Sequence, residues 1–247
     1  MIDGPAVWRQ PGVLQVGLGP RHLVLTNVPD NVADAIELFD GQHSRADIAA
    51  TLDAGWGDWL CGVLDDNDAL AEGPAVRPRC RVAVVGDGAL ATAVARRLVC
   101  QGVTLDSQRP DLVVVAPPRA EADRVAVRGL TEAGLPHLVT ALGFGQATLG
   151  PFVLPGVTAC LNCVDLTRRE ADPAWPLIAF QIAQMTPRDD PLLADWLAAG
   201  VATQVAAHLA GRLPQTCWAT AVFDRADLTP GWAQWPARPE CPCGASG

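Results

Sequence analysis

A chain of 247 residues, 49% of them hydrophobic, is long enough to bury a core without disulfides, and its length allows one or two domains. No run reaches 18 uncharged apolar residues, and the first ten residues lack the basic-then-apolar pattern of a secretory signal. These features argue against a membrane span and predict a cytoplasmic protein.

The charge is unevenly distributed along the chain. The formal net charge of −9 arises in the first 75 residues, which hold 12 acids and 3 arginines, whereas the remainder is balanced. All 18 basic residues are arginine, so no mechanism here can use a lysine. The acidic first third also argues against nucleic acid as a partner, because phosphates need a positive face.

Residues 1–73 predict a small winged-helix-like module. Short runs of β-forming residues, separated by glycine and proline, predict an antiparallel meander of three strands over residues 6–9, 13–18 and 22–27. Pro29 marks the start of a first helix, Ser44 can cap a second, and a third begins near Trp56.

Residues 74–80 are predicted to be a linker, because two prolines in this short stretch prevent regular pairing. Strands then alternate with helices over residues 81–247, which predicts a parallel α/β sheet. The predicted strands cover residues 81–86, 103–106, 112–116, 137–142, 146–154 and 219–223. The predicted helices include residues 119–133, 178–185 and 192–213, and a helix after residue 88 with apolar residues four apart.

Two close cysteine pairs predict a metal site. Cys160 and Cys163 form a C-x₂-C knuckle that can hold one tetrahedral ion, and Cys241 and Cys243 offer a second pair in a Pro- and Gly-rich tail. Four thiolates with no open position describe a closed, structural zinc site, and metal binding would order a terminus with little core of its own.

The alternatives to a metal site are a disulfide, two unrelated buried pairs of cysteines, or a redox-active pair. A disulfide is disfavoured, because C-x-C closes poorly on itself and a cytosol opposes disulfides. A redox-active C-x₂-C is also disfavoured, because such motifs begin a helix after a strand and need no second pair. The four single cysteines are predicted to be small buried hydrophobic residues.

A glycine-rich turn predicts a nucleotide-binding fold. Residues 86–91 fit G-x-G-x-x-A between a strand and a helix, and Asp106 ends the next strand 20 residues after Gly86. Gly86, Gly88 and Asp106 are therefore the candidate nucleotide-binding residues. Asp87 adds a negative charge to the turn, and only four residues separate Asp106 from Asp111. The alternative is a nucleotide fold kept for its architecture.

These features together resemble the ThiF/E1-like superfamily of adenylating enzymes over residues 80–247. The closest branch is that of the E1-like, leader-peptide-binding partner proteins of azole- and azoline-forming (TOMM-type) peptide cyclodehydratases. The stretches that carry the resemblance are the glycine-rich turn, residues 143–145, 150–156, 160–166 and 172–175, the C-terminal cysteine pair, and, in the first segment, residues 9–12, 16–20 and 38–41.

The resemblance implies a function in the biosynthesis of ribosomally made, modified peptides (RiPPs). Family members use a winged-helix-like recognition element to bind a precursor leader, present the core to a separate ATP-using YcaO-type cyclodehydratase, and carry a structural zinc. The resemblance also implies a homodimer. Active relatives need an arginine, a lysine and a magnesium-binding Asp near the triphosphate. This chain has no lysine, so we expect a degenerate, non-adenylating protein without catalytic residues, for which ATP is a doubtful cofactor.

Two functions of other classes remain as alternatives. The first is an ATP-dependent ThiF/E1-like enzyme that adenylates a C-terminal carboxylate, and the missing lysine argues against it. The second is a transcriptional regulator that uses the winged helix, and the acidic first third argues against that. For the first segment we expect an extended leader to add to the strand over residues 22–27 and to pack against the helix that begins near Trp56.

Overall fold

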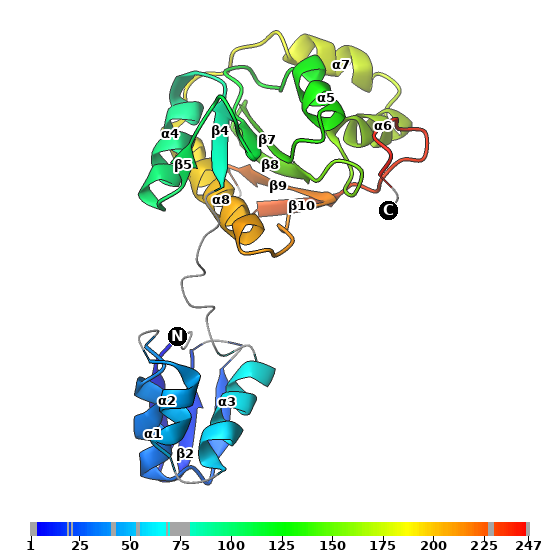
Figure 1. Ribbon diagram of the computed structural model, residues 1–247. Coiled ribbons are helices and arrows are strands. Elements are labelled where there is room, and N and C mark those ends of the chain that lie inside the picture. The colour runs from blue at the N-terminus through cyan, green and yellow to red at the C-terminus, as the bar shows by residue number, and fades with distance from the viewer. Residues whose placement is uncertain are drawn as a thin grey trace. The chain divides into compact units, whose positions relative to one another are not determined.

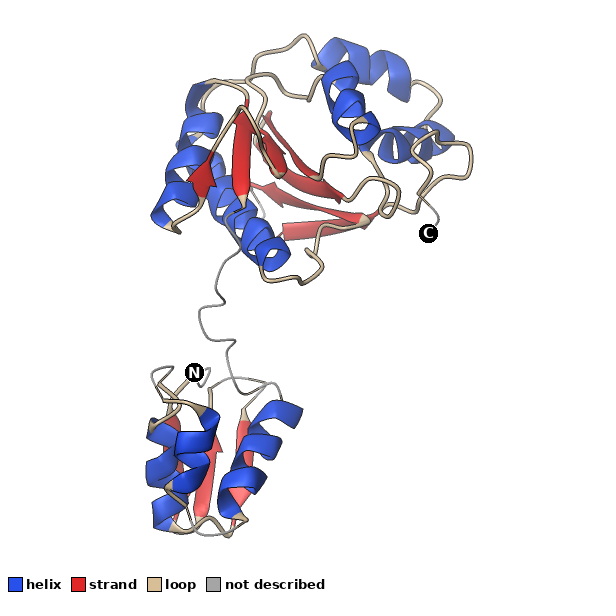
Figure 2. Ribbon diagram, in the orientation of Figure 1, coloured by secondary structure: helices blue, strands red, loops and turns tan. Residues whose placement is uncertain are grey.

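The structure is a computed structural model that describes residues 4–18, 20, 22–40, 43–52, 55–67, 69, 80–226 and 230–245 (Figures 1 and 2). Its contacts divide the chain into two compact units, Met1–Val76 and Arg77–Gly247. The predicted linker over residues 74–80 lies outside the described residues except for Cys80, so that boundary stays a prediction.

The first unit has three strands followed by three helices, in the predicted order. They are β1 (Ala6–Gln10), β2 (Val13–Val16), β3 (Leu23–Thr26), α1 (Asp30–Glu37), α2 (Arg45–Ala50) and α3 (Trp56–Asp66). The strands form an antiparallel sheet in the order β1-β2-β3. Ser44 caps α2 as predicted: its hydroxyl accepts a hydrogen bond from the amide of Asp47, whose carboxylate accepts from the amide of Ser44.

One core holds the first unit together. Leu14 of β2 and Leu25 of β3 point toward the helices and pack with Ile36 of α1 and with Leu60 and Leu64 of α3, all of them buried. The alternating exposure of β2 and β3 follows from the two-residue period of a strand that covers a core on one face.

The second unit contains the other elements. They are β4 (Arg81–Val85), α4 (Gly88–Cys100), β5 (Thr104–Leu105), β6 (Leu112–Val115), α5 (Arg124–Glu132), β7 (His137–Gly143), β8 (Gln146–Val153), α6 (Leu161–Ala171), α7 (Trp175–Ile182), α8 (Pro191–Leu209), β9 (Ala219–Asp224) and β10 (Pro230–Gln234).

The sheet of this unit is mixed, whereas the alternation of strands and helices predicted a parallel one. Its order is β10-β9-β8-β7-β6-β4-β5, in which β7, β6, β4 and β5 are parallel and β8, β9 and β10 are antiparallel. The reason is the short turn after β7, which reverses the chain directly into β8 and leaves no room for the crossover that a parallel neighbour needs.

Helices cover both faces of this sheet (Figure 1). On one face α4 and α8 bury the side chains of alternate strand residues, among them Val114 and Leu138. On the other face α5 and α6 cover Val113 and Val139. The helix α8 is long and apolar enough to cross a membrane by length and composition alone, but residues such as Leu197 and Val201 are buried in this core. Its apolar character therefore reflects core packing.

Two local predictions need correction, and two elements were missed. The helix predicted over residues 119–133 begins at Arg124, because Asp123 caps it by accepting hydrogen bonds from the amides of Val125 and Ala126. The helix α6 and the strand β10 were not predicted at all. Of the four single cysteines only Cys217 is buried, and Cys100 is exposed.

Candidate functional site

The four predicted metal ligands converge from two distant parts of the chain. Cys160 is the N-cap of α6 and Cys163 lies in its first turn, while Cys241 and Cys243 lie in the C-terminal tail. A redox-active C-x₂-C pair begins a helix after a strand, and α6 does begin here after β8. The position of Cys160 and Cys163 at a helix start therefore does not exclude a redox-active pair. The second cysteine pair, brought alongside by the tail, is what favours a metal site.

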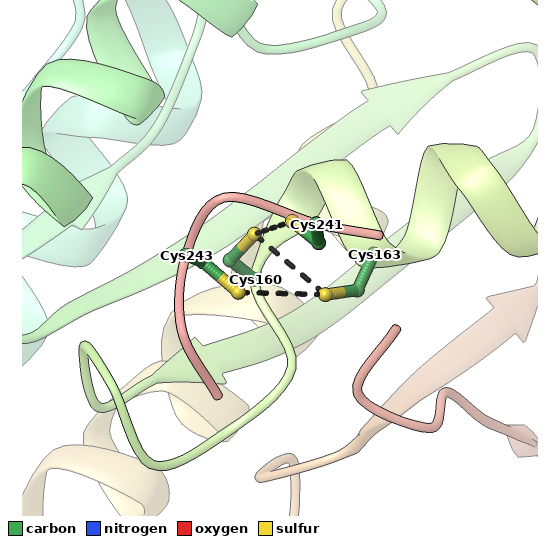
Figure 3. Close-up of side chains that lie close together, drawn as sticks. All are labelled: Cys160, Cys163, Cys241 and Cys243. Carbon is green, nitrogen blue, oxygen red and sulfur yellow. Dashed lines mark hydrogen bonds between the residues drawn. The ribbon is translucent and has the colours of Figure 1, made fainter. Parts of the chain in front are cut away.

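The sulfur atoms have the spacing of a tetrahedral site (Figure 3). The Sγ–Sγ distances are 3.9 Å for Cys160–Cys163 and 3.6 Å for both Cys160–Cys241 and Cys163–Cys243, and all four sulfurs lie within 4.8 Å of one another. A zinc ion with Zn–S bonds of about 2.3 Å places its sulfurs about 3.8 Å apart. The four residues therefore fit such an ion.

The surroundings also suit thiolates. Three of the cysteines are buried, and the side-chain amide of Asn162 donates a hydrogen bond of 3.0 Å to Cys241 Sγ. The thiol of Cys160 donates to Cys163 and holds the pKa of Cys163 below its usual value, while the pKa of Cys160 is raised because it keeps the shared proton. A buried cluster of this kind suggests a zinc site.

The glycine-rich turn lies at the carboxyl end of β4, where a nucleotide-binding fold places its ligand. Gly86 has a positive φ of 136°, and a Cβ at this position would lie 1.8 Å from the carbonyl oxygen of Ala116. Gly86 is therefore required by the close approach of β4 and β6, with or without a ligand. Gly88 also has a positive φ, 84°, but faces open space.

Asp106 lies below the glycine-rich turn. In the parallel register Val82 pairs with Leu105, so Asp106 is level with Ala83, three residues before Gly86 and about 10 Å away along the strand. Its carboxylate accepts hydrogen bonds from the backbone amides of Gln108 and Arg109, which hold its pKa below the usual value. The carboxylate thus stabilises the turn formed by residues 106–109, and its role in nucleotide binding stays a prediction.

A pocket that the sequence did not predict lies beside α7. It has a volume of about 850 Å³ and is lined by Pro118 and Arg119 after β6, by Arg124 of α5, and by Trp175 and Phe180 of α7. Three of its charged side chains pair with one another, whereas Arg119 and Arg169 line it without a salt bridge to any residue that the structure describes. The guanidinium of Arg124 binds Glu121 at 2.8 Å and Asp165 at 3.1 Å, and Arg119 donates to Gln184.

In the first unit the predicted peptide-binding edge is open. Among the described residues no strand pairs with the outer side of β3, whose Val24 is 37% exposed. On α3 the indole of Trp59, also 37% exposed, meets that of Trp56 edge-on at 5.1 Å. Asp58 and Asp66 of α3 are exposed as well.

Two further residues take structural roles. His208 packs on the ring of Phe152 at 5.1 Å, as a packing histidine would. Burial raises the pKa of Cys217 to about 11, which disfavours its thiolate and any nucleophilic role.

No protein-family model and no curated protein matches this chain. Solved structures share its fold over almost its whole length, and three of them serve as examples. The heterocyclase TruD matches with a TM-score of 0.70 and 18% identity, over 98% of this chain and 42% of TruD. A heterocyclase in complex with substrate and cofactor matches with a TM-score of 0.69 and 16% identity, over 98% of this chain and 38% of that one. E. coli MccB with ATP matches with a TM-score of 0.65 and 13% identity, over 97% of each chain. The chain thus spans less than half of either heterocyclase. The likeness confirms the E1-like fold predicted from the sequence.

Proposed function

We propose that this chain is a non-catalytic, E1-like adaptor that binds the leader of a ribosomally made precursor peptide and presents it to a separate YcaO-type cyclodehydratase. The observation that carries the proposal is the open β3 edge in an acidic unit of a chain with the heterocyclase fold. TruD is more than twice as long as this chain, and the proposal assigns the heterocyclising step to a partner enzyme.

The physical route is strand addition. A leader in extended conformation would pair its backbone with the free edge of β3 and place alternate side chains against the exposed indole of Trp59. The acids of this unit, including Asp58 and Asp66 on α3, favour a leader with basic residues and would speed its encounter.

The test is calorimetric titration of the full chain with synthetic leaders of the precursor peptides encoded beside its gene. Val24 and Val7 offer a matched pair, because both face Gln15 in the same row of the sheet, one on each edge strand. A charged side chain on an edge opposes strand addition. We expect Val24→Lys to weaken leader binding about tenfold, or about 1.4 kcal/mol, and Val7→Lys to leave it within about twofold. Equal effects of the two substitutions, or no binding by any leader, would overturn the proposal.

A second pair tests the contribution of charge. Asp58 lies on α3, whereas Asp34 lies on α1, the helix that contacts β1. Removing a charge at the rim of an interface chiefly slows association and reduces its salt dependence. We expect Asp58→Asn to slow leader association about two- to fivefold at low salt, and Asp34→Asn to change it less.

The second candidate is an ATP-dependent adenylating enzyme, favoured by the glycine-rich turn and by the fold shared with MccB, which has been solved with ATP. The absence of lysine and the position of Asp106 below the turn weigh against it. Pyrophosphate released from ATP by the purified chain in the presence of a peptide would establish this candidate and exclude the adaptor.

We also propose that the four cysteines hold one structural zinc ion and that the chain forms a homodimer. When bound, zinc would supply no chemistry beyond joining Cys160 and Cys163 to Cys241 and Cys243, because four thiolates leave it no open position. Elemental analysis and light scattering of the purified chain test these two points.

A further inference from the structure

Arg168 occupies an unusual position between two indole rings. It lies on α6, five residues after Cys163, and its guanidinium carbon is 4.5 Å from the ring centroid of Trp175 and 5.1 Å from that of Trp235. No hydrogen bond or ion pair joins the guanidinium to any residue that the structure describes. The two indoles are therefore the side chains in direct contact with it, while Glu121 and Asp165 attract it from a longer distance.

The indole of Trp235 belongs to the tail that carries the second cysteine pair, Cys241 and Cys243. Trp235 lies six residues before Cys241 and packs on the cysteine cluster. Its backbone amide donates to the carbonyl of Trp218 at 2.7 Å, and its indole nitrogen donates to the hydroxyl of Thr220 at 3.0 Å. These two bonds attach one side of the residue to Trp218 and to β9, and the packing on the cysteine cluster is the contact through which metal binding would restrain the ring.

The other indole belongs to Trp175, the first residue of α7. Trp175 donates from its indole nitrogen to Asp165 at 2.9 Å, and three residues after the end of α7 the carbonyl of Met185 accepts from the amide of Ala120 at 3.1 Å. Between these attachments α7 has no buried residue, and Leu177 and Phe180 are 64% and 66% exposed. The position of α7 beside its large pocket therefore depends on contacts at its two ends.

We propose that Arg168 couples the cysteine site to α7, so that a metal ion bound by the four cysteines holds α7 in place beside the pocket. The path runs from the metal-bound tail through Trp235 to Arg168, and from Arg168 to Trp175. Without the metal the tail loosens and Arg168 loses its contact with Trp235. The helix α7 then moves away from the sheet of the second unit more often. Because coupling is reciprocal, loosening Arg168 also weakens metal binding by the same factor.

The inference rests on the proposed metal, and hydrogen exchange of the full chain, with and without zinc, tests it. In the wild-type protein we expect zinc removal by a chelator to speed exchange over residues 175–185 about tenfold, the size expected from losing a partly buried cation–π contact. We expect Arg168→Ala to show the faster exchange even with zinc bound, and zinc removal to add little further. Chelator competition should show zinc affinity lowered by a similar factor.

Matched controls make the outcome decisive. Arg169 is the next residue, exposed and at the pocket rim, so Arg169→Ala should behave like the wild type. Arg168→Lys retains the charge and should restore part of the protection at α7. Acceleration confined to the tail over residues 235–245, or additive effects of zinc removal and Arg168→Ala, would overturn the coupling. So would acceleration at α7 that only follows the core strands β6 and β7, since that is global unfolding. Purified protein without zinc would instead refute the proposed metal.

Discussion

The two units of this chain use their distinctive residues in different ways. The second unit holds every motif that suggests chemistry, yet its structure uses most of them internally: Gly86 lets β4 approach β6, and Asp106 closes its own turn. The first unit holds no such motif, but among its described residues the outer edge of β3 is unpaired and several acids are exposed. Motifs that suggest catalysis can thus become structural in one unit, while the proposed recognition would depend on a strand of the other unit that carries no motif.

The largest expected effect comes from removing the metal. We expect Cys163→Ser to abolish zinc binding and to destabilise the second unit by about 3 kcal/mol or more, or about 10 °C in Tm, because metal binding contributes directly to folding. The exposed Cys100 offers the control, and Cys100→Ser should change neither property. Calorimetry with zinc analysis measures both. If the melting temperature of the first unit falls together with that of the second, the two units are not independent.

Substitutions that create a cavity in one core at a time test whether the two units are independent. Leu60 in the first unit and Leu197 in the second are both fully buried, so each change to alanine should cost about 2–5 kcal/mol in its own unit. We expect only Leu60→Ala to weaken leader binding, as measured by titration below the melting temperature of the variant. Loss of binding in Leu197→Ala would show that recognition depends on the second unit.

The two glycines of the turn should separate structure from ligand binding. Gly86→Ala forces a Cβ onto the carbonyl of Ala116 and should cost about 2–3 kcal/mol, whereas Gly88→Ala has space and should cost about 1 kcal/mol for its positive φ. Denaturation in urea without nucleotide gives both values. Equal costs would contradict the structural role assigned to Gly86.

Acid should weaken the second unit gradually. Burial lowers the pKa of His137 and of His208 below the usual value of 6.5, so the unfolded chain takes up protons there before the folded one does. Their contribution to stability is complete above about pH 6.5 and decreases as pH falls below it, by at most about 1.4 kcal/mol per pH unit for each histidine. Urea titrations at several pH values check this slope, and His208→Gln should reduce it.

Sequence patterns predicted elements that local rules determine. Ser44 caps α2, and Leu90, Val94 and Leu98 form the buried face of α4, because a cap and a helical period are visible in a few neighbouring residues. The four cysteines were also found, since thiol pairs at short spacing have few other uses.

Features that depend on distant partners were missed. The strand β10 contains Pro230 and Gly231, which disfavour strands, and pairing with β9 overrides that preference. The helix α6 begins at Leu161, and its N-cap residue, Cys160, makes no side-chain capping hydrogen bond. The 20-residue spacing of Asp106 matched a nucleotide site, but the register that places it level with Ala83 is visible only in the folded sheet.

If the first unit binds the leader, hydrogen exchange with and without a bound leader should locate the contact. We expect protection at the amides of β3 and α3, unchanged by adding ATP, with no change at the glycine-rich turn or α7. Protection at the turn or at the pocket beside α7, with β3 unaffected, would contradict leader binding by the first unit.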